Sequence, residues 1–325
     1  GNSTMRTGTL GNGNNGQWGW GYFIGQYFDE NRITVENHAL GGTSSRTFYN
    51  RLWPDVRKGL KPGDWVIVEL GHNDNGPFDE GRARASIPGT GKDSLLVTIK
   101  ETDIRETVYS YGEYMRRFIA DTRAAGANPV LLSLTPRNAW TADGKRIVRK
   151  DDSFTPWIKA ICKELLKKAG YSADDITNFD SFKKVVEDIT ANKFERFGRE
   201  KVNYMFYLDK IHTSEFGAQI NAGSAAEGIA SCKKLELKKY LKPLQTPVVN
   251  GLKRKKGKPV IFFTGDSTVK NADKEEDGMW GLGSVAGCAF DTTKVTLMNC
   301  AVAGRSTRTY LDEGHWDRVY NSIQP

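Results

Sequence analysis

Two short apolar runs, each bounded by turn residues, are the clearest elements of this chain. Trp65 to Leu70 (WVIVEL) and Val130 to Leu134 (VLLSL) are rich in β-branched residues and leucine, as is typical of strands buried on both faces of a parallel sheet. Between them apolar side chains recur at helical spacing, at Ile104, Val108, Tyr111, Met115, Phe118 and Ile119. Gly126 follows as a stop signal. The pattern predicts a helix that joins two parallel strands.

Three further runs are candidate strands: Ile33 to Asn37, Val260 to Thr264 and Val295 to Asn299. Two of them lie in corresponding parts of a long-range repeat. Gly1 to Met5 (GNSTM) matches Gly265 to Val269 (GDSTV), QWGWG matches MWGLG, and NHALGGTSSRTF matches NCAVAGRSTRTY, in the same order. A duplication of this length is not a solenoid.

The repeat predicts a division of the chain into three parts. Residues 1–235 form one domain that lacks its first strand, and residues 259–325 are a partial second copy that runs from its first strand to its second. Residues 236–258 are rich in lysine and contain Pro243, Pro247 and Gly257, so we expect an exposed basic linker there.

Composition narrows the class of protein. No apolar run approaches the roughly 18 residues that a membrane span needs, so a membrane protein is not expected. The net charge of +8 suits a polyanionic partner, and charge alone does not separate nucleic acid from an acidic polysaccharide. Four cysteines without a CxxC pair are expected to be buried thiols.

Two serines occupy a position suited to a nucleophile. Ser3 and Ser267 lie in G-[ND]-S-T turns, and Ser267 follows a predicted strand, where its hydroxyl would point out of the sheet edge at which α/β folds bind ligands. Taken alone, this short motif is more often a plain turn or helix cap.

Other motifs predict the rest of an acyl-transfer site. Asn73, in the GHND that follows Trp65 to Leu70, can donate its side-chain amide to an oxyanion, and Gly42 or Gly304 can donate a backbone N–H to the same oxygen. Asp209 precedes His212 by three residues, so a base and the acid that orients it can come from one turn.

Together these blocks resemble the signature of the SGNH (GDSL-like) hydrolase superfamily. The surrounding sequence is similar to that of the rhamnogalacturonan acetylesterases of carbohydrate esterase family 12, in segments that include QWGWG, VELGHND, SIPGTG and DKIHTSEFGAQINA. The resemblance implies a flavodoxin-like three-layer α/β/α sandwich with a mostly parallel sheet and a catalytic triad of Ser3 or Ser267, His212 and Asp209. It also implies an oxyanion hole that contains Asn73 and Gly42 or Gly304.

The resemblance further implies a secreted or periplasmic enzyme that removes acetyl groups from an acidic polysaccharide, with no metal or organic cofactor and with neither nucleic acid nor a membrane as partner. Within RARASIPGTG, Arg84, Pro88 and Gly89 are expected to contact substrate; Arg46, Arg82 and Arg137 are further candidates for uronate carboxylates. Two alternatives stay open: an esterase that acts on another acylated glycan or a lipid, and a carbohydrate-binding relative without catalysis.

Which serine serves His212 also stays open. The first copy starts at the motif itself, and the second copy ends before the position that corresponds to Gly63. In one hypothesis, Val260 to Thr264 fills the first-strand position beside Trp65 to Leu70, within the chain or by strand exchange with a second copy, and brings Ser267 to His212. In the other, Ser3 faces His212 and the tail begins an unfinished second domain.

Overall fold

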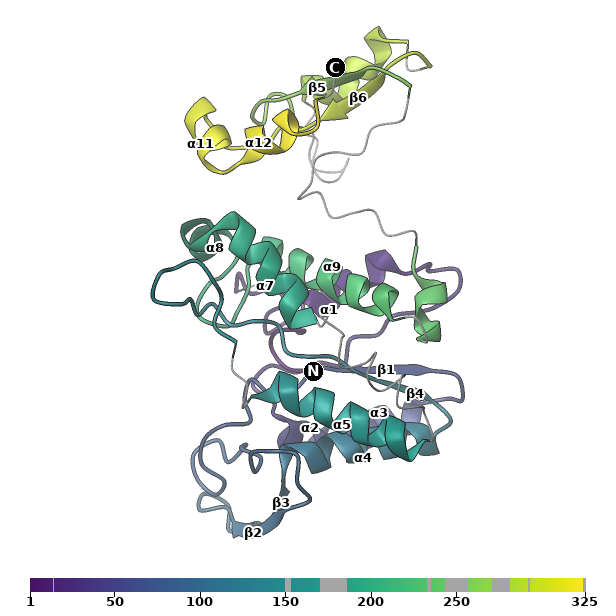
Figure 1. Ribbon diagram of the computed structural model, residues 1–325, viewed down its shortest axis with the longest axis vertical. Coiled ribbons are helices and arrows are strands. Elements are labelled where there is room, and N and C mark those ends of the chain that lie inside the picture. Colours follow the sequence, from purple (N-terminus) through teal and green to yellow (C-terminus); the bar gives the residue numbers. More distant parts are fainter. Residues whose placement is uncertain are drawn as a thin grey trace. The chain divides into compact units, whose positions relative to one another are not determined.

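The computed structural model describes residues 1–13, 15–149, 153–169, 186–232, 235–242, 257–270, 281–291 and 293–323. The chain divides into an N-terminal unit, Gly1–Leu244, and a C-terminal unit, Gln245–Pro325 (Figure 1). In the ranges that the structure describes, no helix is long and apolar enough to span a membrane.

The centre of the N-terminal unit is a parallel pair of strands, β1 (Trp65–Val68) and β4 (Asn128–Leu131). Both predicted strands are present, but β1 ends before Leu70, and β4 begins before Val130 and ends before Leu134. Successive side chains of a strand point to opposite faces, so Trp65 and Ile67 pack into one core cluster while Val66 and Val68 pack into another. Two apolar faces explain why β1 is a continuous apolar run.

One face of this pair is covered by helices from the two ends of the unit. They are α1 (Trp20–Phe23), the 3₁₀ turns η1 (Ile24–Tyr27) and η2 (Glu236–Tyr240), and α9 (Glu215–Ser231). Ser214 caps α9 by accepting a hydrogen bond from the backbone N–H of Gly217. The core side of α9 consists largely of alanine, such as Ala222 and Ala226, which lets the neighbouring elements approach closely.

The other face is covered by four helices: α2 (Ser45–Arg51), α3 (Trp53–Gly59), α4 (Tyr111–Ala124) and α5 (Phe154–Lys168). Phe118 of α4 packs edge-on against Trp53, with ring centroids 5.1 Å apart. Figure 1 shows β1 and β4 between this layer and the layer that contains α1 and α9. The three-layer α/β/α architecture is therefore confirmed.

A third apolar cluster supports the segment that precedes His212. Helices α7 (Val186–Phe197) and α8 (Arg199–Met205) bring Phe194 against Phe206, with ring centroids 5.4 Å apart. Both rings are fully buried. The turn from Asp209 to His212 therefore follows directly on a well-packed apolar cluster.

The predicted helix between the two strands is wrong over its first part. This part contains a strand, β3 (Arg105–Tyr109), which pairs antiparallel with β2 (Ser94–Thr98). Val108 lies within β3, and Ile104 comes immediately before it. Within β3 only Val108 is fully buried, and the strand is held by its antiparallel pairing with β2. The helix begins only after Ser110, whose side chain accepts from the backbone N–H of Glu113.

In the C-terminal unit, β5 (Val260–Phe263) and β6 (Thr296–Asn299) form a parallel pair, as predicted for both runs. Its described helical elements are α10 (Leu282–Val285), η5 (Ala286–Ala289), α11 (Thr307–Asp312) and α12 (His315–Tyr320). The strand predicted over Ile33 to Asn37 is wrong, because that segment is not a strand. Its C-terminal counterpart, β6, pairs with β5, whereas no described strand of the N-terminal unit pairs with residues 33–37.

The predicted boundary of the basic linker is also wrong. Residues 236–242 belong to the N-terminal unit: Leu237 is only 1% exposed, and Leu241 bridges to Phe28. The apolar side chains of this segment fill the core beside α1 and α9 while its lysines face outward. Most of the remaining predicted linker, 243–256, lies outside the described residues.

Candidate active site

The turn that carries Ser3 is held by its neighbours. The side-chain oxygen of Asn2 accepts hydrogen bonds from the backbone N–H and the hydroxyl of Thr4, at 3.0 and 2.8 Å. The carbonyl of Asn2 accepts from the N–H groups of Met5 and Arg6. A short polar side chain that closes its own turn is a common device at tight turns. Ser3 is thereby fixed in a largely buried position.

A buried carboxylate lies beneath this turn. One oxygen of Glu69 accepts from Thr4 Oγ1 at 3.0 Å and from Trp20 Nε1 at 2.7 Å, and the other accepts from the backbone N–H of Thr135 at 2.9 Å. Burial raises the pKa of Glu69, although these hydrogen bonds favour the charged form. Glu69 was not predicted as a site residue. The available signal was a single acid within the apolar run from Trp65 to Leu70.

His212 lies between Ser3 and Asp209. Its Nε2 is 3.0 Å from Ser3 Oγ, and its Nδ1 is 2.6 Å from a carboxylate oxygen of Asp209. The other Asp209 oxygen accepts from the backbone N–H groups of Ile211 and His212, each at 2.7 Å. Burial alone would raise the pKa of Asp209, but the hydrogen bonds and the charge of His212 outweigh burial and lower it.

The segment after His212 fastens this turn to the nucleophile side of the site. Thr213 accepts from Trp18 N–H through its carbonyl, at 3.0 Å, and donates its hydroxyl to the carbonyl of Trp18, at 2.8 Å. Gln17 donates its side-chain amide to the carbonyl of Ser3 at 3.1 Å. Residues far apart in the sequence thus fix the distance between Ser3 and His212.

The predicted oxyanion donors lie on two loops that bind each other. Gly42 has φ of 79°, a conformation that favours glycine. An ideal Cβ on Gly41 would lie 3.8 Å from Ser3 Cβ. Asn73 Nδ2 donates to the carbonyl of Thr43 at 2.9 Å, which leaves the second amide hydrogen for another acceptor. The structure therefore brings Gly42 and Asn73 together beside Ser3.

The next residue of the GHND motif, Asp74, connects the loop of Asn73 to the segment that follows Gly42. It is buried and accepts from the backbone N–H and hydroxyl of Ser45, and from Ser86 Oγ at 2.8 Å. Burial raises the pKa of Asp74, against the effect of these hydrogen bonds. Asp74 thus joins the GHND loop to the start of α2, through Ser45, and to the loop that carries Arg82, Arg84 and Ser86.

His72 of the same motif is a neutral buried group. Burial, followed by the positive charges of Arg137 and His212, lowers its pKa from 6.5 to about 3. Arg137, a predicted uronate contact, instead donates to the backbone carbonyl of His72 at 3.0 Å. Arg46 is not available to substrate at all, because it is fully buried and forms two hydrogen bonds with Glu106.

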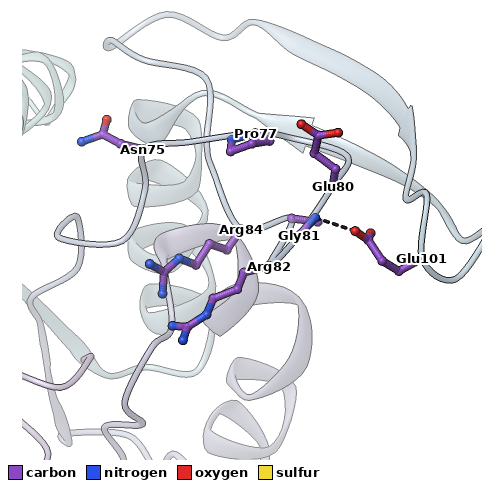
Figure 2. A pocket seen from close by; sticks show the side chains of 8 residues that line it. Asn75, Pro77, Glu80, Gly81, Arg82, Arg84 and Glu101 are labelled. Carbon is purple, nitrogen blue, oxygen red and sulfur yellow. Dashed lines mark hydrogen bonds between the residues drawn. The ribbon is translucent and has the colours of Figure 1, made fainter.

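Figure 2 shows a cleft of about 500 Å³ near the loop that carries Arg82 and Arg84. Its lining residues are Asn75, Pro77, Glu80, Gly81, Arg82, Ala83, Arg84 and Glu101. Arg84 donates to the carbonyl of Gly42 at 2.9 Å. Pro88 and Gly89 do not line this cleft; Gly89 instead accepts from the N–H of Gly112 in α4, at 3.0 Å.

Ser267 and Gly304 lie in the C-terminal unit. Of the two hypotheses for the serine that serves His212, the structure has Ser3 at hydrogen-bonding distance. The one histidine of the C-terminal sequence, His315, binds Glu313 at 3.0 Å. Three of the cysteines, Cys162, Cys232 and Cys300, are partly buried free thiols, and burial raises the pKa of Cys162 to about 12.

Comparison with known proteins identifies a family profile and several relatives that match this chain. The profile of the GDSL-like Lipase/Acylhydrolase family matches residues 1–222. A rhamnogalacturonan acetylesterase from Emericella nidulans is 28% identical over 231 residues, which cover 70% of this chain and 82% of that protein. The probable rhamnogalacturonan acetylesterase YesY of Bacillus subtilis is 33% identical over 139 residues, 42% of this chain and 52% of its own. A crystal structure of YxiM from Bacillus subtilis aligns with 66% of this chain and 50% of its own at 23% identity and a TM-score of 0.45.

Proposed function

Because this chain belongs to the GDSL-like lipase and acylhydrolase family, we propose that its N-terminal unit is a serine acetylesterase that removes O-acetyl groups from the pectic polysaccharide rhamnogalacturonan. The observation that carries the proposal is the continuous hydrogen-bonded chain from Ser3 Oγ through His212 to Asp209, at 3.0 and 2.6 Å. A nucleophile, a base and an orienting acid in contact are what acyl transfer through a serine requires.

The proposed reaction has two steps. His212 Nε2 takes the proton of Ser3 Oγ as the oxygen attacks the acetyl carbonyl, and the C–O bond to the sugar breaks as the imidazolium returns the proton to the sugar oxygen. Water then attacks the acetyl-serine with His212 again as base, which releases acetate and restores Ser3. Asp209 accepts from Nδ1 throughout, and its lowered pKa keeps it charged near neutral pH.

The proposed oxyanion hole consists of the backbone N–H groups of Ser3 and Gly42 and the side-chain amide of Asn73. Asn73 Nδ2 is held by the carbonyl of Thr43. The Gly42 turn is held by Arg84. Fixed donors of this kind stabilise the charge that develops on the carbonyl oxygen without reorganising during the reaction.

Two observations favour an acidic polysaccharide as substrate. Relatives that carry the name rhamnogalacturonan acetylesterase match this chain at 28% and 33% identity, and arginine side chains line the cleft beside the proposed oxyanion hole. A polymer of this kind does not cross a membrane, so we place the proposed reaction outside the cytoplasm.

The decisive experiment measures acetate release by the full chain from acetylated rhamnogalacturonan and from acetylated xylan, with Ser3→Ala as the control variant. We expect faster release from rhamnogalacturonan, and none above background with the variant. Preference for xylan, or hydrolysis only of p-nitrophenyl acetate, would replace the proposed substrate and leave the esterase chemistry in place. Equal activity of the variant would overturn the mechanism.

A further inference from the structure

Arg82 and Arg84 form an unusual pair of cations at the edge of the proposed oxyanion hole. An ideal Cβ on Gly42 would lie 3.7 Å from Arg82 Nη1 and 3.8 Å from Arg84 Nη1, so both guanidinium groups lie against the same glycine. Figure 2 shows the two side chains extending side by side in the same direction from one wall of the cleft. Two like charges on one loop repel each other, and an anion bound between or beside them relieves that repulsion.

The described residues supply no carboxylate that binds this pair directly. Neither arginine forms an ion pair with a described residue, and Arg82 makes no side-chain hydrogen bond within that part of the chain. The two acids that line the cleft have other partners: Glu101 accepts from the backbone N–H of Gly81 at 2.6 Å, and Glu80 pairs with Lys100 at 2.7 Å. Asp74 acts on Arg84 through its charge but is buried beneath the loop.

The backbone that presents the pair is strained and anchored. Ala83, between the two arginines, has φ of 40° although it is not glycine, and its side chain is buried. Non-glycine residues adopt such a conformation rarely, and when they do they are often at functional sites. Hydrogen bonds hold the conformation on both sides, from Ala83 N–H to the carbonyl of Glu80 and from Ser86 N–H to the carbonyl of Asp74, each at 3.0 Å.

The geometry points to a carboxylate-binding subsite in which Arg82 and Arg84 hold a uronic acid carboxylate of the bound polysaccharide. The planar guanidinium group suits a carboxylate because it donates two parallel hydrogen bonds. Arg84 is tied to the carbonyl of Gly42, so a bound uronate would also fix the substrate relative to the oxyanion donors. The inference rests on the proposed function, since it names the feature by which that site would select its polysaccharide.

Arg82→Gln tests the subsite because, in the part of the chain that the structure describes, Arg82 makes no side-chain hydrogen bond to the proposed oxyanion loop, whereas Arg84 donates to the carbonyl of Gly42. The substrates are acetylated rhamnogalacturonan oligosaccharides with free carboxylates and the same oligosaccharides after methyl esterification. We expect the variant to lose about tenfold in kcat/KM on the free acids, mostly through KM, and much less on the neutral esters. Arg123→Gln, which removes an exposed arginine from the last turn of α4, should leave both values unchanged.

A second measurement separates failure of the subsite from failure of the proposed function. Binding of non-acetylated oligogalacturonate to the Ser3→Ala protein is followed by calorimetry, with and without Arg82→Gln. Binding that weakens about tenfold with Arg82→Gln supports the subsite even if rhamnogalacturonan is not the substrate. The subsite is refuted if acetate is released but Arg82→Gln loses the same factor in kcat/KM on the free acids and on the methyl esters. It is also refuted if oligogalacturonate does not bind.

Discussion

The turn around Ser3 and the turn around Ser267 are built from the same hydrogen bonds. In the first, Asn2 Oδ1 accepts from the N–H and hydroxyl of Thr4 at 3.0 and 2.8 Å. In the second, Asp266 Oδ1 accepts from the N–H and hydroxyl of Thr268 at 2.9 and 2.8 Å. Asn therefore replaces Asp in the first turn with little change in geometry.

The agreement continues into the following segments. Asn37 Nδ2 donates to the carbonyl of Met5 at 2.9 Å, and Asn299 Nδ2 donates to the carbonyl of Val269 at 2.8 Å. Gly42 and Gly304 have φ of 79° and 73°. Each glycine is followed by a helix with a capping box, formed by Ser44 with Thr47 and by Ser306 with Thr309.

The two turns differ in what surrounds them. Thr4 Oγ1 also reaches Glu69, and Ser3 Oγ reaches His212, while Thr268 is exposed. The local sequence is therefore enough to form the turn, and the turn alone is not a catalytic site. Catalysis by this design requires partners from distant parts of the chain, such as Glu69 for Thr4 and His212 for Ser3 in the N-terminal unit.

The sharpest test of this difference is to remove each serine in turn. Ser3→Ala should lower kcat for p-nitrophenyl acetate by at least about 10⁴-fold, because the nucleophile is lost. Ser267→Ala should keep wild-type turnover. A serine-directed phosphonate, followed by mass spectrometry, should label Ser3. Labelling of Ser267, or loss of activity in Ser267→Ala alone, would revive the hypothesis in which the C-terminal strand brings Ser267 to His212.

A smaller loss is expected when one oxyanion donor is removed. Asn73→Ala should reduce kcat by about 10²- to 10³-fold, since a single fixed donor contributes about 2.7 to 4 kcal/mol to lowering the barrier. KM should change little, because the hydrogen bond strengthens only in the transition state. An effect confined to KM would mean that Asn73 binds the ground state and not the oxyanion.

A matched pair of variants probes the shared framework itself. Asn37→Ala removes the side-chain bonds to Met5 O and Ala39 N, and Asn299→Ala removes the equivalent bonds to Val269 O and Ala301 N. Each loss should cost about 1 to 3 kcal/mol of local stability. Only Asn37→Ala should lower turnover, by about tenfold, because only its turn positions a serine against a histidine. Equal loss in both variants would show that the C-terminal unit contributes to catalysis.

These contrasts also explain what the sequence could predict. The strands at Trp65 and Val130 were recognisable because burial on both faces leaves a continuous apolar run. Short motifs with fixed spacing identified Asp209 and His212, which one turn brings together. The strand predicted at Ile33 failed for the opposite reason: a strand depends on its neighbour, and the local pattern does not say whether a neighbour is present.

Long-range polar contacts were the part that sequence could not provide. In the sequence, Glu69 is one acid in an apolar run. In the structure it accepts hydrogen bonds from Thr4, Trp20 and Thr135, which lie on three distant segments. The four candidate arginines look alike in sequence, yet Arg46 is a buried structural residue while Arg82 lines the cleft. Only packing distinguishes them.

Because His72 is buried, we expect the folding stability of the N-terminal unit to decrease at acidic pH. Its pKa is lowered to about 3, chiefly by burial, whereas the unfolded chain has the ordinary value of 6.5. Above pH 6.5 neither state binds the proton, and the stabilising contribution is complete. As the pH falls from 6.5 towards 3, the unfolded state takes up a proton that the folded state refuses, so stability declines.

We therefore expect the free energy of unfolding to fall between pH 7 and pH 4.5 by on the order of 2 kcal/mol more in the wild type than in His72→Gln, whose side chain does not titrate. Urea denaturation at the two pH values measures this difference. His38→Gln, which removes an exposed histidine of the same unit, is the matched control. If His72→Gln and the wild type lose stability in parallel, the imidazole of His72 takes up its proton in the folded protein, and burial does not lower its pKa as far as about 3.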